Sequence, residues 1–474
     1  FTKLNMLKGL TKDFILYGIG GALSKASSII LLPFYTFYFS PEEYGVLELL
    51  TIIITLSSIM GLLQLESSLS RFFYEYKTEE RKQLITTLFL FSGLLSFIIT
   101  IILWMFGNSI NILIFDSLAY INAYNISLLS LPLFCLNSLL IVIIRFTEKK
   151  QIFIQSQGLL SLANLITPVI LVYFYDFGIS SFFWGQFFGL LLAVIFITLS
   201  SKNDFGKTFS IKFIGPSLKY SLPLIPGVAS GWINSYGSRF LMISFLSFKE
   251  IGIYAAAIKI ASVFQLIGSA FRMTWPQFFW KTFKEDKNHK QVFRTIHYWI
   301  SLIISAAIIF FTIFVADVAS LILKEDYNKA ITYIPMISFS FLIQSFFIQI
   351  VGVGPSIKYK TKFNSYAFIL GTLLNLITLV IFLPKIGLIA VPISFLISSL
   401  VSYFTLWYFS ELLYKINFSK RITILHFSLI LSIIFFVLFY TLSLQEKLLL
   451  FLASMLILIF TSNKITSKIK VFLK

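Results

Sequence analysis

The chain has 474 residues, of which 58% are apolar and only 12% are charged, about half the charged share of a soluble globular protein. This composition excludes an ordinary soluble fold, which would need far more polar surface to cover its core, and it also excludes a disordered chain. The formal net charge of +18 fits nucleic acid in principle, but the placement of the basic residues argues against that partner.

Apolar segments of the length of a spanning helix, roughly 20 residues, recur along the whole chain. About fourteen are predicted, with centres near residues 26, 57, 94, 131, 165, 190, 232, 264, 305, 342, 373, 399, 433 and 454. The ten-residue alternation of a barrel strand is missing, so we predict an all-α polytopic membrane protein. The first segment continues well past the apolar core of a signal peptide, which predicts a retained helix.

The basic residues alternate between the loops of the two membrane faces. Eight regions that include both termini hold 29 of the 38 Lys and Arg residues, whereas the seven loops of the other face hold 5. Cytoplasmic loops carry the excess of basic residues, so we expect both termini in the cytoplasm and the net charge to reflect topology.

The loops leave no room for a separate catalytic domain, because none exceeds about 20 residues. No phosphate-binding or zinc-protease motif is present. Cys135 stands alone in an apolar stretch, so a disulfide framework or cysteine metal site is excluded. We therefore expect neither an enzyme nor a bound cofactor.

Two stretches of the chain are repeated at nearly the same spacing. FSPEEYGV (39–46) matches LSFKEIGI (246–253), and NLIT (164–167) recurs as NLIT (375–378), followed by DFGI (176–179) and KIGL (385–388). An even number of helices in each repeat makes the repeats parallel. We predict a six-helix bundle over 1–205, a second over 206–412, and two additional spanning helices over 413–474.

Six charged residues fall inside the apolar segments: Lys25, Glu48, Glu66, Arg239, Lys259 and Arg272. A charge at the centre of a spanning helix costs roughly 2.5–3.5 kcal/mol, so such residues usually face a bundle interior or a watery cavity. Two such bundles would meet at a central cleft, the usual place for a transporter's site. Four cations against two anions predict a net positive cleft, which suits phosphate.

Helical periodicity suggests how these residues are arranged. Glu48 and Glu66 are 18 residues apart, five whole turns, which places them on one stripe of the second helix. The repeat register predicts that Lys25, Glu48, Lys259 and Arg239 converge on the cleft, with Arg272 off that stripe. Prolines in the first and seventh spans, including Pro33, Pro223 and Pro226, predict kinks that could act as bending points.

Structural alternatives exist for each of these residues. Lys25 and Lys259 could pair with an acid instead of touching substrate, Arg239 could snorkel to the outer interface, and Arg272 and Glu66 could lie at the cytoplasmic rim. Asp317 is expected to be a solvated cap and Arg71 to be interfacial. Gln344 and Gln349 either line the cleft or bond neighbouring helices.

The span count, the parallel repeat and the segments LSKASSIILLPFYTFYFSPEEYGVLELL (23–50) and LSRFFYE (69–75) resemble the Wzx-type polysaccharide or O-antigen flippases of the multidrug/oligosaccharidyl-lipid/polysaccharide (MOP) exporter superfamily. The resemblance implies two bundles in a V, in the inner membrane of a bacterium. It implies movement of undecaprenyl-pyrophosphate-linked oligosaccharide to the outer leaflet by alternating access. Membrane lipids and other polysaccharide-assembly proteins are the remaining expected partners.

In such relatives, cations in the central cavity contact the pyrophosphate, and Lys25, Lys259 and Arg272 stand at the matching positions. Arg239 is a further candidate for binding substrate, because of its place in the repeat. Glu48 or Glu66 could couple transport to protons or sodium. A lysine in the first helix departs from the lipid II flippases, which disfavours that alternative. The multidrug antiporters generally have an acid in the first helix, where this chain has Lys25, so a cation-coupled multidrug antiporter is a disfavoured alternative. A membrane-embedded glycan-modifying enzyme is a further alternative.

Overall fold

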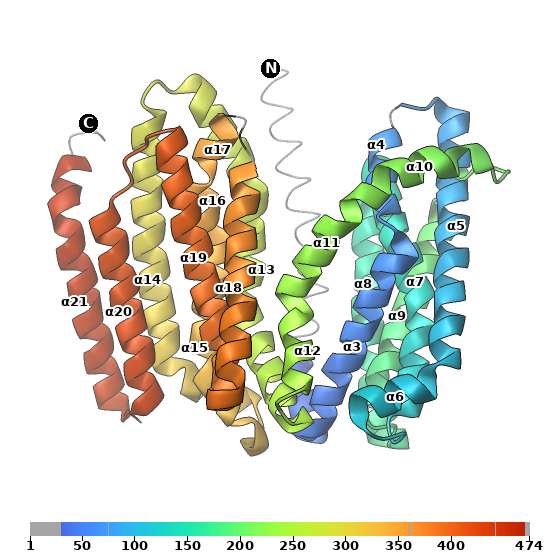
Figure 1. The fold of residues 1–474 in the computed structure, drawn as a ribbon, viewed down its shortest axis with the longest axis horizontal. Helices are drawn as coiled ribbons and strands as arrows, with labels where there is room; N and C mark the ends of the chain where they lie inside the picture. The colour runs from blue at the N-terminus through green and yellow to red at the C-terminus, as the bar shows by residue number, and fades with distance from the viewer. Residues whose placement is uncertain (1–29, 74, 359, 361, 441, 470–474) are drawn as a thin grey trace. The chain divides into compact units, whose positions relative to one another are not determined.

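Figure 1 shows the fold in a computed structural model, which describes residues 30–73, 75–358, 360, 362–440 and 442–469. Throughout these residues the regular secondary structure is helical, so the predicted all-α fold is confirmed. The chain divides at Gly252 into two compact units, each described by itself here. We call the part up to Gly252 unit 1 and the part from Ile253 onwards unit 2.

In unit 1, α8 and α9 form a helical hairpin against which α7 packs. Its helices are α2 (Leu32–Tyr38), α3 (Pro41–Leu62), α4 (Leu65–Phe72), α5 (Thr78–Met105), α6 (Gly107–Phe115), α7 (Ile121–Phe146), α8 (Lys150–Tyr175), α9 (Ser180–Ser200), α10 (Ile214–Ser221), α11 (Ile225–Trp232) and α12 (Ser238–Ile243). The last three are fragments of one irregular segment. A 3₁₀ turn at Leu222–Leu224, which contains Pro223, separates α10 from α11 and confirms the predicted break there. A π-helix at Ile233–Gly237, which contains no proline, separates α11 from α12.

Unit 2 contains a second hairpin, α18 and α19, and the two C-terminal helices, which pack on α14. Its helices are α13 (Phe248–Glu285, whose first turn belongs to unit 1), α14 (His289–Ile322), α15 (Lys329–Leu342), α16 (Ile348–Val351), α17 (Val353–Ile357), α18 (Lys362–Ile386), α19 (Ala390–Leu413), α20 (Lys420–Phe439) and α21 (Leu444–Ile469). A π-helix at Ile343–Phe347 joins α15 to α16.

Eleven stretches of the described chain are long and apolar enough to cross a membrane, which makes this a multi-pass membrane protein. The number is smaller than fourteen for three reasons. One stretch, Lys362–Leu413, includes both α18 and α19. The span expected near residue 232 is divided among short helices, and most of the span expected near residue 26 lies outside the described residues.

The repeated motif begins a long helix in both places where it occurs. The Ser40 hydroxyl accepts a hydrogen bond from the Glu43 amide, and the Glu43 carboxylate accepts one from the Ser40 amide, at 3.2 and 2.8 Å. Ser247 and Glu250 repeat this capping box at 3.3 and 3.0 Å, at the start of α13. Each motif therefore satisfies two backbone donors that a helix start leaves free.

The glycines of the two motifs bring these helix starts into direct backbone contact. A Cβ built on Gly252 would overlap the Pro41 carbonyl oxygen, and one built on Gly45 would overlap the Phe248 carbonyl oxygen. The contact is reciprocal, as expected for equivalent parts of a repeat. Glycine is needed at both positions because only a residue without Cβ allows backbones to approach so closely.

The second repeated pair of motifs also adopts matching backbone conformations. Gly178 of DFGI and Gly387 of KIGL have φ of 53° and 63°, and each lies in the turn of its helical hairpin. Such left-handed conformations favour glycine. The predicted repeat therefore has structural support in both units. The predicted boundary after residue 205 stays a prediction, since α10 and α11 pack on α4 and α3 and cluster with unit 1.

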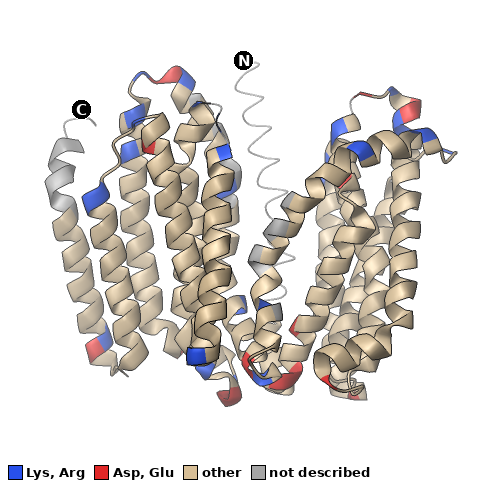
Figure 2. Cartoon of the chain, in the orientation of Figure 1, with Lys and Arg blue, Asp and Glu red and all other residues tan. Residues whose placement is uncertain are grey.

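Figure 2 shows that, within each unit, most Lys and Arg residues gather at one end of the helices. In unit 1 that end carries the basic residues of the 71–83, 145–150 and 202–219 segments. The basic loops that alternate along the sequence therefore lie mostly at one end of the helices in each folded unit.

The two C-terminal helices are tied to α14 by a buried histidine. His426 on α20 is within 2.8 Å of the Ser301 hydroxyl on α14 and 3.4 Å of the Thr461 hydroxyl on α21. At the opposite end, Lys447 contacts Asp317 at 2.7 Å. Asp317 is therefore an ion-pair partner rather than only a solvated cap.

Replacing His426 with alanine should lower the free energy of unfolding by about 1–3 kcal/mol, because the buried Ser301 hydroxyl loses its partner. The change is measured by thermal unfolding of the purified protein in detergent. Ser428→Ala, on the exposed face of the same helix, is the control and should have almost no effect. An equal effect of both substitutions would contradict the assigned role of His426.

Candidate functional site

Arg239 and Glu48, two of the candidate residues, form an ion pair inside unit 1. The Arg239 Nη2 and Glu48 Oε1 atoms are 2.9 Å apart, and the side chains are 5% and 19% exposed. The guanidinium also lies 5.1 Å from the centre of the Tyr236 ring. This burial excludes a snorkelling Arg239, and the pairing neutralises two of the six predicted charges.

The irregular segment around the π-helix positions Arg239 against α3. Trp232 is the last residue of α11, directly before the π-helix, and its Nε1 donates a hydrogen bond to the Thr55 hydroxyl on α3 at 3.3 Å. A π-helix rotates everything that follows it relative to a regular α-helix. The regular period of an α-helix therefore could not predict from the sequence which side chain Arg239 contacts, and so could not show that Glu48 and Arg239 form a pair.

Glu66 is not on the stripe of Glu48, so that prediction is wrong. Leu63 and Gln64 have φ of 46° and 58°, which ends α3 at Leu62 and starts α4 at Leu65. Five regular turns do not separate the two carboxylates, because the helix is interrupted between them. Glu66 is half-buried, and its Oε2 atom is buried without a hydrogen-bond partner among the described residues.

Arg272 lies in unit 2, half-buried on α13, where its Nη1 donates to the Ser345 hydroxyl at 2.7 Å. Ser345 belongs to the π-helix between α15 and α16, and it packs against Gly268, one turn before Arg272. Within the described part of the chain, no carboxylate lies within ion-pairing distance of this guanidinium. The arginine therefore keeps its net positive charge inside unit 2.

The remaining candidates are less fully placed. Lys259 is half-buried on α13, and Lys25 lies outside the described residues. The convergence of Lys25, Glu48, Lys259 and Arg239 on one cleft stays a prediction. Arg71 pairs with Glu75 at 3.0 Å and is 56% exposed, as expected for an interfacial residue.

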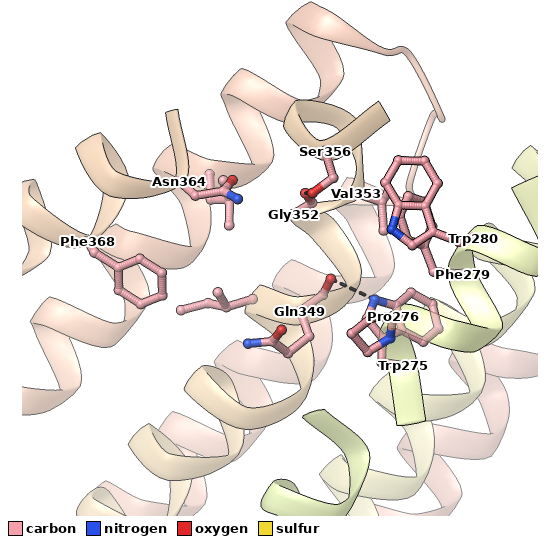
Figure 3. A pocket seen from close by; sticks show the side chains of 12 residues that line it. Trp275, Pro276, Phe279, Trp280, Gln349, Gly352, Val353, Ser356, Asn364 and Phe368 are labelled. Atoms are coloured by element: carbon pink, nitrogen blue, oxygen red, sulfur yellow. Dashed lines mark hydrogen bonds between the residues drawn. The ribbon is translucent and has the colours of Figure 1, made fainter. Parts of the chain in front are cut away.

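A pocket of about 160 Å³ lies in unit 2 between α13, α16, α17, α18 and α19 (Figure 3), and its first lining residues on α13, Trp275 and Pro276, follow Arg272 by about one turn. Trp275, Trp280 and Phe368 contribute aromatic rings, and Gln349 and Asn364 contribute amides. Gln349 therefore lines a pocket inside unit 2, and its place at the predicted central cleft stays a prediction.

The pocket could not be found from the sequence, because its walls come from segments far apart in the chain. Two features of the sequence point to it: Gln349, which is a polar residue in an apolar span, and the tryptophans of α13. The other glutamine, Gln344, donates to the Ser399 hydroxyl of α19 at 3.0 Å. For Gln344 the helix-bonding alternative is therefore the correct one.

The sequence model of the family described as "Polysaccharide biosynthesis protein" matches residues 38–279. A curated relative from Haemophilus influenzae, "Lsg locus putative protein 1", is 23% identical over 300 residues. That match covers 61% of this chain and 69% of the relative.

Solved structures of membrane transporters, among them the following two, have a similar fold. The lipid II flippase MurJ, in an inward closed conformation, matches with a TM-score of 0.73 and 15% identity, over 96% of this chain and 100% of that one. An inward-facing multidrug resistance MATE transporter of the MOP superfamily matches with a TM-score of 0.64 and 15% identity, over 83% and 94%. The fold is therefore that of the MOP exporters.

Proposed function

Because this chain belongs to the polysaccharide biosynthesis protein family, we propose that it is a flippase for undecaprenyl-pyrophosphate-linked oligosaccharide in the bacterial inner membrane. The proposal places both termini in the cytoplasm, as the basic loops indicate. Two bundles that rock around a hydrated cleft expose the glycan to one side and then the other, while the polyprenyl tail stays in lipid.

Arg272 is the observation that carries this proposal. It is a half-buried cation in an apolar protein, and within the described chain it is bonded to a neutral hydroxyl and not to a carboxylate. A guanidinium binds phosphate through two parallel hydrogen bonds, and a neutral partner leaves most of its donors for that task. We assign the pyrophosphate to Arg272, together with Lys259 and Lys25.

The two acidic candidates have different roles in this proposal. Glu48 pairs with Arg239, so these two residues hold the irregular segment against α3 and are released only if that contact opens. Glu66 has a buried oxygen without a partner in the described chain, so it is the better carrier of a coupling proton or sodium ion.

Replacing Arg272 with alanine should slow leaflet exchange of a lipid-linked glycan at least about tenfold, because a hydrogen bond to a charged group contributes about 1.5–3 kcal/mol. Exchange is measured in liposomes that contain the purified protein. Arg272→Lys should retain part of the activity, since lysine supplies the charge without the planar fork. Arg294→Ala, an exposed arginine on α14, is the control. Wild-type exchange by a stable Arg272→Ala variant would remove the site assignment.

The lipid II flippase alternative is separated by substrate. The same liposomes are loaded with lipid II or with undecaprenyl-pyrophosphate oligosaccharide, with and without proton and sodium gradients. The proposal expects faster exchange of the oligosaccharide lipid, and no growth of a strain depleted of its murein flippase when this protein is supplied. Preference for lipid II, or complementation of that strain, would favour the alternative.

A further inference from the structure

The pocket one turn along α13 from Arg272 differs from the anion site proposed above, because the described residues that line it include no charged side chain. Aromatic rings, aliphatic groups, two amides and one hydroxyl surround it. A pocket of this kind is suited to an uncharged ligand with both apolar faces and hydrogen-bonding groups.

The aromatic wall of the pocket is held in place by its neighbours. The Trp275 indole donates from Nε1 to the Gln349 carbonyl oxygen at 2.9 Å, as the dashed line in Figure 3 shows. Trp275 also stacks on Phe271 and Phe278, with ring centres 5.4 and 5.8 Å apart. Only 5% of Trp275 is exposed, so the ring is a fixed surface rather than a mobile one. Gly352 also lines the pocket, and a Cβ built on it would lie only 3.3 Å from the Leu406 Cδ2 atom.

The polar groups of the pocket are not all satisfied by the protein. The side-chain oxygen of Asn364 is buried and accepts no hydrogen bond from the described residues. Ser356 donates its hydroxyl hydrogen to the Gly352 carbonyl at 3.2 Å, which leaves its oxygen able to accept. A buried acceptor without a donor is costly, and a ligand hydroxyl group would supply the missing donor.

We propose that this pocket binds one uncharged sugar ring, and that it selects the glycan carried by the flippase; this selection rests on the proposed function. The C–H faces of a sugar ring pack on aromatic rings, and its hydroxyls bond to amides such as Gln349 and Asn364. An acyl chain would leave the Asn364 oxygen without a partner in an apolar medium. A phosphate would find no cation among the described residues of the lining.

The position of the pocket agrees with such a ligand. Pro276, which lines it, follows Arg272 by four residues on α13, about one turn or 5.4 Å along the helix. A lipid-linked glycan whose phosphate is held by Arg272 therefore has a neighbouring sugar within reach of the pocket.

The test uses the full-length protein in detergent and a panel of neutral methyl glycosides, with binding followed by ligand-observed NMR. We expect saturable binding that discriminates among the glycosides. Phe368→Leu and Asn364→Ala should each weaken it at least about fivefold, because each removes a contact to the ring. The matched control is Phe382→Leu on the same helix. Phe382 is 37% exposed, close to the 41% of Phe368, but does not line the pocket.

Three binding results would overturn the proposal. These are no saturable glycoside binding by the wild type, equal binding by Phe368→Leu and Phe382→Leu, or displacement of the glycoside by a sugar-free phospholipid. The experiment does not depend on transport, so it separates this inference from the proposed function. Loss of leaflet exchange for every lipid-linked glycan, with glycoside binding intact, would contradict the flippase alone. Glycan-independent exchange would contradict selection by the pocket.

Discussion

Replacement of Arg239 with alanine is expected to destabilise the protein by about 3–5 kcal/mol, since it leaves the carboxylate of Glu48 without its ion-pair partner in a buried position. The pair joins α12 to α3 within unit 1, at an N–O distance of 2.9 Å. Glu48 is only 19% exposed, so water cannot fully replace the guanidinium. Thermal unfolding in detergent measures the loss.

A double-mutant cycle separates the cost of a lone charge from the contribution of the pair. Glu48→Gln combined with Arg239→Ala removes both charges and should recover much of the stability lost by Arg239→Ala alone, because no buried charge remains. If the double variant is as unstable as the single one, the ion pair is not the cause. A stable double variant that no longer catalyses leaflet exchange would assign the pair a role in the transport cycle as well.

Replacement of Gly252 with alanine is expected to cost about 3 kcal/mol or more, at the upper end of overpacking effects. The added Cβ would overlap the carbonyl oxygen of Pro41. The obstacle is backbone, not the end of a flexible side chain, so the helix starts of α3 and α13 must separate to relieve it. The loss is followed by thermal unfolding and by the yield of folded protein in the membrane.

A second glycine provides a control of opposite sign. Gly158 lies in α8, and a Cβ built there meets nothing within 4 Å. Gly158→Ala should therefore raise stability by up to about 1 kcal/mol, because alanine favours the helix and restricts the unfolded chain. If Gly252→Ala were as benign as Gly158→Ala, the close contact between the two motifs would not exist.

These two predictions concern the same part of unit 1 and rest on different forces. The glycine contact depends on backbone shape and is insensitive to salt, whereas the ion pair depends on charge. Because the Ser40 and Ser247 capping boxes fix where α3 and α13 begin, a shift of either helix start would disturb both features. The two effects should therefore be partly non-additive when Gly252→Ala and Arg239→Ala are combined.

The sequence alone determined the membrane fold and the parallel repeat. Both depend on local pattern: the length of the apolar segments predicts the spans, and the basic loops and the recurring motifs predict their arrangement. The equivalence of FSPEEYGV and LSFKEIGI was also visible, and the structure explains its glycines by the contact of the two helix starts.

The tertiary structure decided which charges pair and which do not. Periodicity tells which residues share one face of a regular helix, but it cannot show a break such as Leu63–Gln64 or a π-helix such as Ile233–Gly237. Contacts between helices depend on the rotation and approach of separate segments. Only the fold could therefore show that Arg239 neutralises Glu48, that Arg272 bonds a hydroxyl, and that α13 and α18 enclose a pocket.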